Sequence, residues 1–367
     1  MVDKSDAERV LDMSETGIGQ TTAASGVGDI NTHPFQFNGT GKEFFGIWIV
    51  NILLTIITLG IYSAWAKVRT KRYFNGNTQL ASHSFDYHAN PVAILKGRII
   101  VVVVLVVLNL LSQINPLLAI GVLVFYAIAL PWVIVRGLKF NANMTSYRNV
   151  RFHFEGTKWD AFKAYILWPL LATVTFGAFA PYASRANARF LGDGHSFGSS
   201  TFAADPPLKP YYKALGLSSV LIVVPLILVA IMGGITYSTS IDPDLVLIIL
   251  PVIIGVVYFG FIVAFLIYAA HSRNIGFNNL HLREGHRFTS TVTVKSFLWI
   301  LITNFLLIIV TIGLYIPWAK VRLARYLADN TTMLAKGDLD RFTDEQIEGR
   351  GVASGEFLDI EGIDFGF

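Results

Sequence analysis

The chain alternates between long uncharged apolar stretches and shorter basic ones. Residues 99–135, 214–241 and 245–270 contain no Asp, Glu, Lys, Arg or His, and only the polar residues 112–116 interrupt the first stretch. A bilayer core of about 30 Å requires roughly 20 apolar residues in a helix. The pattern therefore predicts four membrane-spanning helices, at 97–112, 116–135, 214–237 and 245–270.

One pattern of aromatic and basic residues occurs three times, beginning at Thr58, Thr175 and Thr311. In each copy a glycine follows two residues after the threonine, an aromatic residue comes two further on, and an arginine and an aromatic residue end the pattern. The first and third copies are identical at ten of the 17 positions from Thr58 to Phe74. This identity indicates an internal threefold repeat, and repeats dictate architecture.

Each copy belongs to a module with four predicted parts. An alternating stretch predicts a strand, an apolar helix ends near the threonine, a basic helix follows, and a further short strand comes last. We expect Gly60, Gly177 and Gly313 to break the helices. A tail precedes three modules that alternate with two transmembrane hairpins, and an acidic tail ends the chain. The segments in chain order are the tail 1–34, module 35–92, hairpin 93–139, module 140–210, hairpin 211–276, module 277–336 and tail 337–367.

The third copy resembles the signature of the YjgN-like bacterial inner-membrane proteins, a family of unknown function. The resemblance rests on residues 311–326, which read Thr-x-Gly-x-Tyr-x-Pro-Trp-Ala-Lys-x-Arg with a following Arg-Tyr, and it covers roughly residues 35–336. The first copy has Ala64 at the proline position, and the second has Tyr182 and Ser184 for the tryptophan and lysine. We therefore expect the middle module to lack what that pair does. The resemblance implies a location in the bacterial inner membrane and supplies no activity.

Three further apolar segments, at 44–64, 161–181 and 296–317, leave two topologies open. If each segment crosses the membrane once, the chain has seven spans and the middle module is inverted, with its basic residues outside. Basic residues favour the cytoplasmic side, so we favour four spans, with the module segments turning back at the glycines. The helix from Phe44 to Thr58 is only about 22 Å long. All three modules then share one orientation, and both tails lie in the cytoplasm.

Composition and charge narrow the classes of protein. Hydrophobic residues make up 53% of the chain and charged residues 15%, against about 25% charged in soluble domains. Residues 1–32 carry a net charge of −4 and residues 338–367 one of −7, so the segment between them carries +15. Bases beside apolar spans are typical of contact with anionic lipid, and no nucleic acid is expected.

Both tails read as disordered polar segments, and the first 30 residues lack the apolar core of an export signal. The chain has no cysteine, which excludes disulfides and thiolate chemistry.

The aromatic and basic residues of the repeat are the best candidates for a binding site. On helices at the membrane interface they would contact anionic headgroups. The alternative is a topological anchor that binds nothing specific. The candidate lipid- or anion-binding residues are Trp65, Lys67, Arg69, Arg72, Arg185, Arg189, Trp318, Lys320, Arg322 and Arg325.

Other kinds of site find little support in the sequence. Asn51 and Asn304 occupy equivalent places in apolar helices, and we expect them to form hydrogen bonds between helices. The eight histidines show no recognised metal spacing, so we predict no metal, no cofactor and no catalytic residue. The uncharged spans also weaken the case for coupled transport.

The sequence thus predicts an all-α, multi-pass membrane protein with short β-strands at its cytoplasmic face and three internal repeats separated by two transmembrane hairpins. The leading hypothesis for its function is non-enzymatic, either engagement of anionic lipid or local organisation of the membrane. An uncoupled channel or carrier for a small solute and a membrane-bound enzyme are the alternatives.

Overall fold

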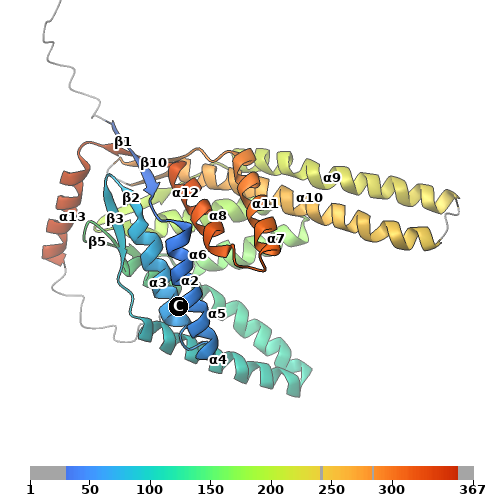
Figure 1. Ribbon diagram of the computed structural model, residues 1–367, viewed down its shortest axis with the longest axis horizontal. Coiled ribbons are helices and arrows are strands. Elements are labelled where there is room, and N and C mark those ends of the chain that lie inside the picture. Colours follow the sequence, from blue (N-terminus) through green and yellow to red (C-terminus); the bar gives the residue numbers. More distant parts are fainter. Residues whose placement is uncertain (1–29, 240–242, 283–284, 354–367) are drawn as a thin grey trace, which may run out of the picture.

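Helical hairpins alternate with the strands of one closed β-barrel in the computed structural model, which describes residues 30–239, 243–282 and 285–353 (Figure 1). The strands in these ranges are β1 (Ile30–Phe37), β2 (Thr78–Leu80), β3 (His83–Tyr87), β4 (Thr145–Tyr147), β5 (Val150–Phe154), β6 (His195–Phe197), β7 (Ser200–Ala204), β8 (Leu280–Leu282), β9 (Arg287–Ser290) and β10 (Thr331–Lys336).

The helices are of two lengths. The long ones are α4 (Pro91–Ile114), α5 (Pro116–Asn143), α9 (Leu208–Thr239) and α10 (Pro243–Asn278). The shorter ones are α2 (Gly41–Ile57), α3 (Ser63–Asn77), α6 (Lys158–Phe162), the π-helix η1 (Lys163–Leu167), α7 (Trp168–Val174), α8 (Ala180–Gly194), α11 (Val294–Val310), α12 (Ile316–Asp329) and α13 (Leu339–Ala353).

All strand pairs of the barrel are antiparallel, and successive strands lie next to each other. The barrel closes because β1 pairs with β2 at Phe37 and Thr78 and with β10 at Ile30 and Lys336. In such a barrel the connections alternate between the two ends. Short turns occupy one end, and a helical hairpin connects every strand pair at the other. All five hairpins therefore leave the barrel from the same end.

The alternation of apolar and polar residues explains the barrel. One phenylalanine from each odd-numbered strand packs into the interior cluster, opposite an apolar residue of the next strand. These phenylalanines are Phe35, Phe85, Phe152, Phe202 and Phe288. Neighbouring positions such as Gln36, Asp86 and Thr289 point to the other face, because side chains alternate along a strand. An apolar interior and a polar exterior suit a barrel in water and are the inverse of a membrane-spanning barrel.

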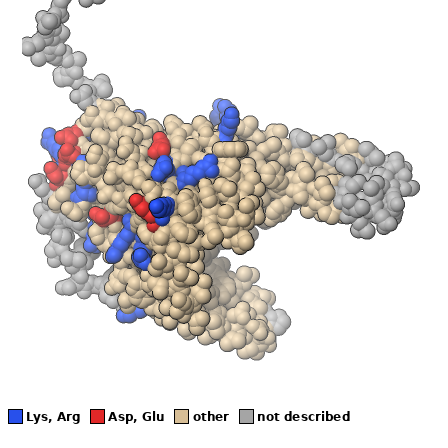
Figure 2. Space-filling model, viewed as in Figure 1, with Lys and Arg blue, Asp and Glu red and all other residues tan. Residues whose placement is uncertain are grey.

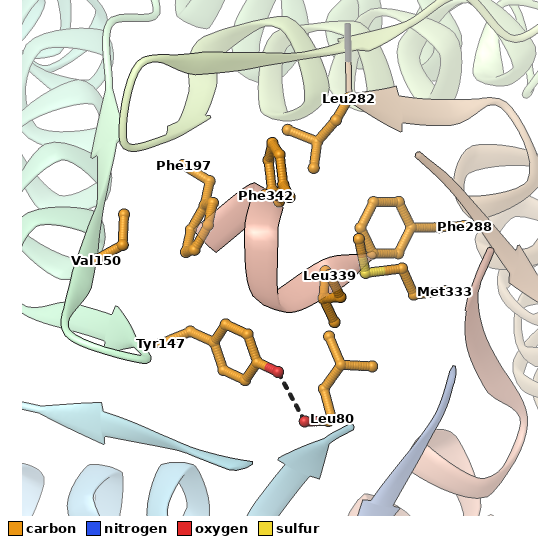
Figure 3. Close-up of a cluster of buried hydrophobic side chains, with 9 residues drawn as sticks. All are labelled: Leu80, Tyr147, Val150, Phe197, Leu282, Phe288, Met333, Leu339 and Phe342. Carbon is orange, nitrogen blue, oxygen red and sulfur yellow. Dashed lines mark hydrogen bonds between the residues drawn. The ribbon is translucent and has the colours of Figure 1, made fainter. Parts of the chain in front are cut away.

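Helix α13 closes the barrel at the end with the short turns. Its Leu339 and Phe342 reach the centre of the apolar interior (Figure 3). At the rim, the Gln346 side-chain oxygen accepts hydrogen bonds from the Ser199 backbone N–H (2.9 Å) and hydroxyl (2.7 Å), and Arg148 pairs with Asp340. The helix thus acts as a plug on the side opposite the hairpins.

The four long helices match the four predicted spans in place and in composition. Among the described residues, four helices have the length and apolar composition to cross a membrane. They form two long hairpins, α4–α5 and α9–α10, which project from the barrel (Figure 1). Both helices of the first begin with Asn-Pro, and Asn90 and Asn115 cap them by accepting hydrogen bonds from the second helical N–H at 2.9 Å.

The three short hairpins are α2–α3, α6 to α8, and α11–α12. Each begins and ends at the barrel. The second helix of each hairpin contacts the first helix of the next, and α12 contacts α2, so the hairpins form a closed ring. The segments near 44–64, 161–181 and 296–317 are each one arm of such a hairpin. Seven single crossings, the topology that we did not favour, are incompatible with this connectivity.

Two sequence-based expectations need correction. The predicted all-α class is too narrow: besides the helices, ten strands form one closed antiparallel barrel, and these include strands that the sequence pattern did not predict. The acidic tail was expected to be disordered from residue 337 on, but residues 339–353 form α13. Its acidic composition concealed the spacing of Leu339, Phe342 and Gln346, which places them on one helical face. The predicted disorder of residues 1–29 and 354–367 lies outside the described residues.

Candidate functional site

The three turns at the tips of the short hairpins share one geometry. At the third, Ile312 and Gly313 both have positive φ (50° and 89°), and the Gly313 N–H donates to the Ile308 carbonyl (2.7 Å). The Thr311 hydroxyl donates to the Leu307 carbonyl at 2.6 Å and accepts the Tyr315 N–H at 3.0 Å. The threonine and glycine thus satisfy backbone groups that a helix end would otherwise leave without partners.

An exposed apolar side chain stands at each of these tips. Leu59, Phe176 and Ile312 are 94%, 101% and 93% exposed. Each also has φ near 50°, a conformation that large side chains rarely adopt. The backbone strain is the same in any solvent. Exposure of the apolar side chains costs free energy in water, and an apolar environment would remove that cost.

The first arginine of the motif connects the two helices of its own hairpin. Arg322 in α12 donates to Asn304 in α11 (3.3 Å), and Arg69 donates to Asn51 (3.5 Å) in the first hairpin. Asn304 also donates to the Ala319 carbonyl at 3.2 Å. Both asparagines are buried. The expected hydrogen bonds between helices are therefore confirmed at both positions.

The second arginine connects its hairpin to the next one around the ring. Arg72 donates to the Tyr87 carbonyl (3.1 Å) in the segment that leads into α4, and Arg325 donates to the Gly39 carbonyl (2.8 Å) before α2. These two guanidinium groups fix neighbouring hairpins against each other.

The middle short hairpin makes the same link through an ion pair. Arg189 and Arg185 contact the Asp205 carboxylate before α9 at 2.7 and 3.0 Å. The hydrogen bond from Arg185 and the charge of Arg189 hold the pKa of Asp205 below its ordinary value. Both arginines therefore share one carboxylate partner within the protein, which compensates one of their two charges.

The two tryptophans of the motif pack against aromatic neighbours. The ring of Trp65 stacks on Tyr62 with centroids 6.1 Å apart. The ring of Trp318 lies 5.0 Å from Phe45 and 6.0 Å from Tyr315. Trp318 thereby joins the last hairpin to the first.

Of the candidate residues, the two motif lysines face a common cavity. Lys67 and Lys320 line a cavity of about 910 Å³ between α2, α3, α4 and α12. Two further bases line it, Lys71 and Arg98. The corresponding position in the middle hairpin is Ser184, whose hydroxyl is 2.8 Å from that of Tyr268.

The cavity is strongly positive. No Asp or Glu lines it among the residues that the structure describes, and no ion pair in that part of the chain involves its four bases. Burial, and then the charges of Arg98 and Lys71, lower the pKa of Lys67; burial also lowers that of Lys71. The Lys71 ammonium lies 5.9 Å from the ring centroid of Tyr87, and Arg98 donates to the Ser63 hydroxyl. A bound anion would relieve the repulsion.

The sequence did not single out Lys71 or Arg98. Lys71 lies four residues after Lys67 in the first copy only, where helical spacing places it on the same face. Arg98 belongs to a long helix far from the motif, and nothing local indicates its position. Within the described ranges, no group of three or more His, Asp or Glu residues could hold a metal ion.

Comparison with known proteins gives related sequences. A family model described as a bacterial protein of unknown function (DUF898) matches residues 32–360. An inner membrane protein YjgN of Salmonella typhimurium (strain LT2) is 28% identical over 85% of this chain and 90% of its own length. The protein of the same name from Escherichia coli O157:H7 is 27% identical over the same shares. No solved structure shows a significant match.

Proposed function

We propose, from the premise that this chain belongs to the DUF898 family of bacterial proteins of unknown function, that it binds anionic lipid headgroups in the inner membrane without catalysing a reaction. One observation carries the proposal. The motif arginines are occupied by partners within the protein, whereas the motif lysines Lys67 and Lys320 line one cavity with two further bases and no acid among its described lining residues.

The placement of the lysines and arginines supports a cytoplasmic location for the barrel. On the face drawn in Figure 2, the Lys, Arg, Asp and Glu side chains gather over the barrel and the adjoining ends of the hairpins, and none is visible on the projecting parts of the hairpins that are drawn in tan. The loop at residues 112–116 and the sequence at 237–244 contain no Lys or Arg. Basic residues favour the cytoplasmic side. The proposal therefore puts the barrel and both tails in the cytoplasm, and all five hairpins enter the membrane from that side.

The proposal also treats the three short hairpins as copies of one module. Their tips share a turn with two consecutive positive φ angles, and in each the last motif arginine reaches the segment before the next hairpin. The middle copy has Ser184 where the others have lysine, so it would contribute nothing to the lipid site. A channel along the barrel axis is less favoured, because α13 and the phenylalanines fill the interior.

The test compares two pairs of lysines. The variant Lys67→Gln/Lys320→Gln removes two charges from the cavity, and Lys42→Gln/Lys295→Gln removes two exposed charges at equivalent starts of α2 and α11. At about 1 kcal/mol for each of the two cavity lysines that contact the headgroup, the cavity variant should bind about 30-fold more weakly.

Native mass spectrometry in nanodiscs of phosphatidylglycerol and phosphatidylethanolamine measures the retained lipid. We expect the control variant to retain phosphatidylglycerol as the unaltered protein does. Equal retention by both double variants would refute the proposal.

A further inference from the structure

The number of bases in the cationic cavity exceeds what a common anionic phospholipid can neutralise. Lys67, Lys71, Arg98 and Lys320 supply four positive charges. A phosphodiester headgroup with a single phosphate carries one negative charge, which leaves three bases uncompensated in a partly buried space. A ligand with at least two negative charges fits this site better.

The bases are also spread over three walls. Lys67 and Lys71 lie one turn apart on α3, Arg98 comes from α4, and Lys320 comes from α12. One phosphate group offers one centre of negative charge, whereas two linked phosphates offer two, which suits bases on different walls. The hydroxyls of Ser63 and Thr70 line the same space and can donate to further phosphate oxygens.

Apolar side chains on one wall of the cavity point to an amphiphile. Ile52 and Ile56 line it from α2, and Ile56 is 66% exposed. A chain leaving the cavity here would run along the exposed apolar side of α2. A soluble anion would make no use of these contacts.

We infer that this cavity takes an amphiphile whose headgroup carries two phosphate groups, with the phosphates among Lys67, Lys71, Arg98 and Lys320 and the hydrocarbon along Ile52 and Ile56. Basic pockets between transmembrane helices on the cytoplasmic side are known to bind such headgroups. The inference rests on the proposed function and specifies its ligand. Two lipids share the chemistry: cardiolipin, with two phosphodiesters, and an isoprenoid diphosphate.

The experiment measures binding of four probes to the full chain in detergent by native mass spectrometry. The probes are cardiolipin, farnesyl diphosphate, phosphatidylglycerol and inorganic diphosphate. We expect at least one of the two-phosphate lipids to bind tenfold or more tightly than phosphatidylglycerol. The lipid that binds more tightly, cardiolipin or farnesyl diphosphate, identifies which kind of two-phosphate lipid the cavity takes. Inorganic diphosphate should bind more weakly than the preferred two-phosphate lipid. Equal binding of the two would show that the hydrocarbon contributes nothing, and would overturn the inference of an amphiphile.

Charge variants separate this inference from the proposed function. Lys71→Gln should reduce affinity for the preferred two-phosphate lipid about fivefold and affinity for phosphatidylglycerol less, and Lys71→Arg should restore the preference. If phosphatidylglycerol binds as tightly as both two-phosphate lipids, the inference is wrong while the proposed function stands. If no anionic lipid depends on Lys67 and Lys320, both are wrong.

Discussion

Replacing Phe342 by alanine should release α13 from the barrel. The Phe342 ring is buried and lies 6.0 Å from the ring of Phe197 and 4.4 Å from that of His286. A buried Phe→Ala change costs about 3–5 kcal/mol. Because the Phe342 ring connects α13 to the barrel, its loss lowers the free energy with which α13 docks on the barrel. At about 1.4 kcal/mol per factor of ten, the undocked population should rise on the order of 10²–10³-fold.

A single engineered thiol can report this opening, because the chain has no cysteine. Val150 is fully buried in the interior cluster with Leu339 and Phe342, so Val150→Cys places the thiol under the plug. Maleimide labelling then proceeds through the undocked state, and its rate should rise with that population. Ile347→Ala is the control, since Ile347 is an exposed apolar residue of the same helix. Equal labelling rates in the Phe342→Ala and Ile347→Ala backgrounds would show that α13 does not seal the barrel.

Two further predictions concern a hairpin tip and a buried tyrosine. Gly313→Ala should lower the free energy of unfolding by about 1–2 kcal/mol, because alanine is strained at φ 89° even though the nearest atom to its Cβ, Ile316 Cδ1, is 3.7 Å away. The helical Gly121→Ala, whose Cβ would have no neighbour within 4 Å, should not lower it in the same thermal measurement. Burial raises the pKa of Tyr87 to about 12, so the unfolded chain ionises first and stability is lost as pH rises from 10 to 12. Tyr87→Phe should reduce this loss of stability at high pH in melting curves recorded from pH 9 to 12. If the loss is unchanged, other titratable groups cause it.

The sequence predicted the existence of the long helices better than their ends. The predicted helix 116–135 runs on to Asn143 in α5, and 245–270 runs on to Asn278 in α10. The length of an uncharged stretch indicates how much of a helix can lie in hydrocarbon. Charged residues end that stretch without ending the helix, since Lys and Arg are good helix formers. The helices continue into water until they reach the barrel.

The barrel could not be derived from local patterns. Phe35, Phe152 and Phe288 each precede the motif glycine of their copy by 25 residues, and all three lie in the barrel interior. Phe85 and Phe202 belong to strands outside the motif, so the same pattern did not find them. Strands of three to eight residues whose partners lie up to about 300 positions away, as Ile30 and Lys336 do, leave only a weak local signal.

The candidate site was predicted in part. The motif identified the right helices, but most of its bases hold the ring of hairpins together: Arg322 within a hairpin, Arg72 and Arg325 between hairpins. A basic residue on an interfacial helix looks the same in sequence whether it faces lipid or a backbone carbonyl. Only the three-dimensional partners separate the motif lysine from the motif arginines.

Closure of the barrel is what assembles the cationic cavity. Lys67 and Lys320 are more than 250 residues apart, and they meet because β1 pairs with both β2 and β10, which sets the first hairpin beside the last. No chain connection crosses this seam at the hairpin end; Arg325 on the Gly39 carbonyl and Trp318 against Phe45 hold it. Under the proposed function, a lipid that contacts both lysines bridges the same seam. A ligand that binds only the closed form stabilises it, by about 2.7 kcal/mol at a hundred times its dissociation constant. Lipid binding and barrel closure must then strengthen each other.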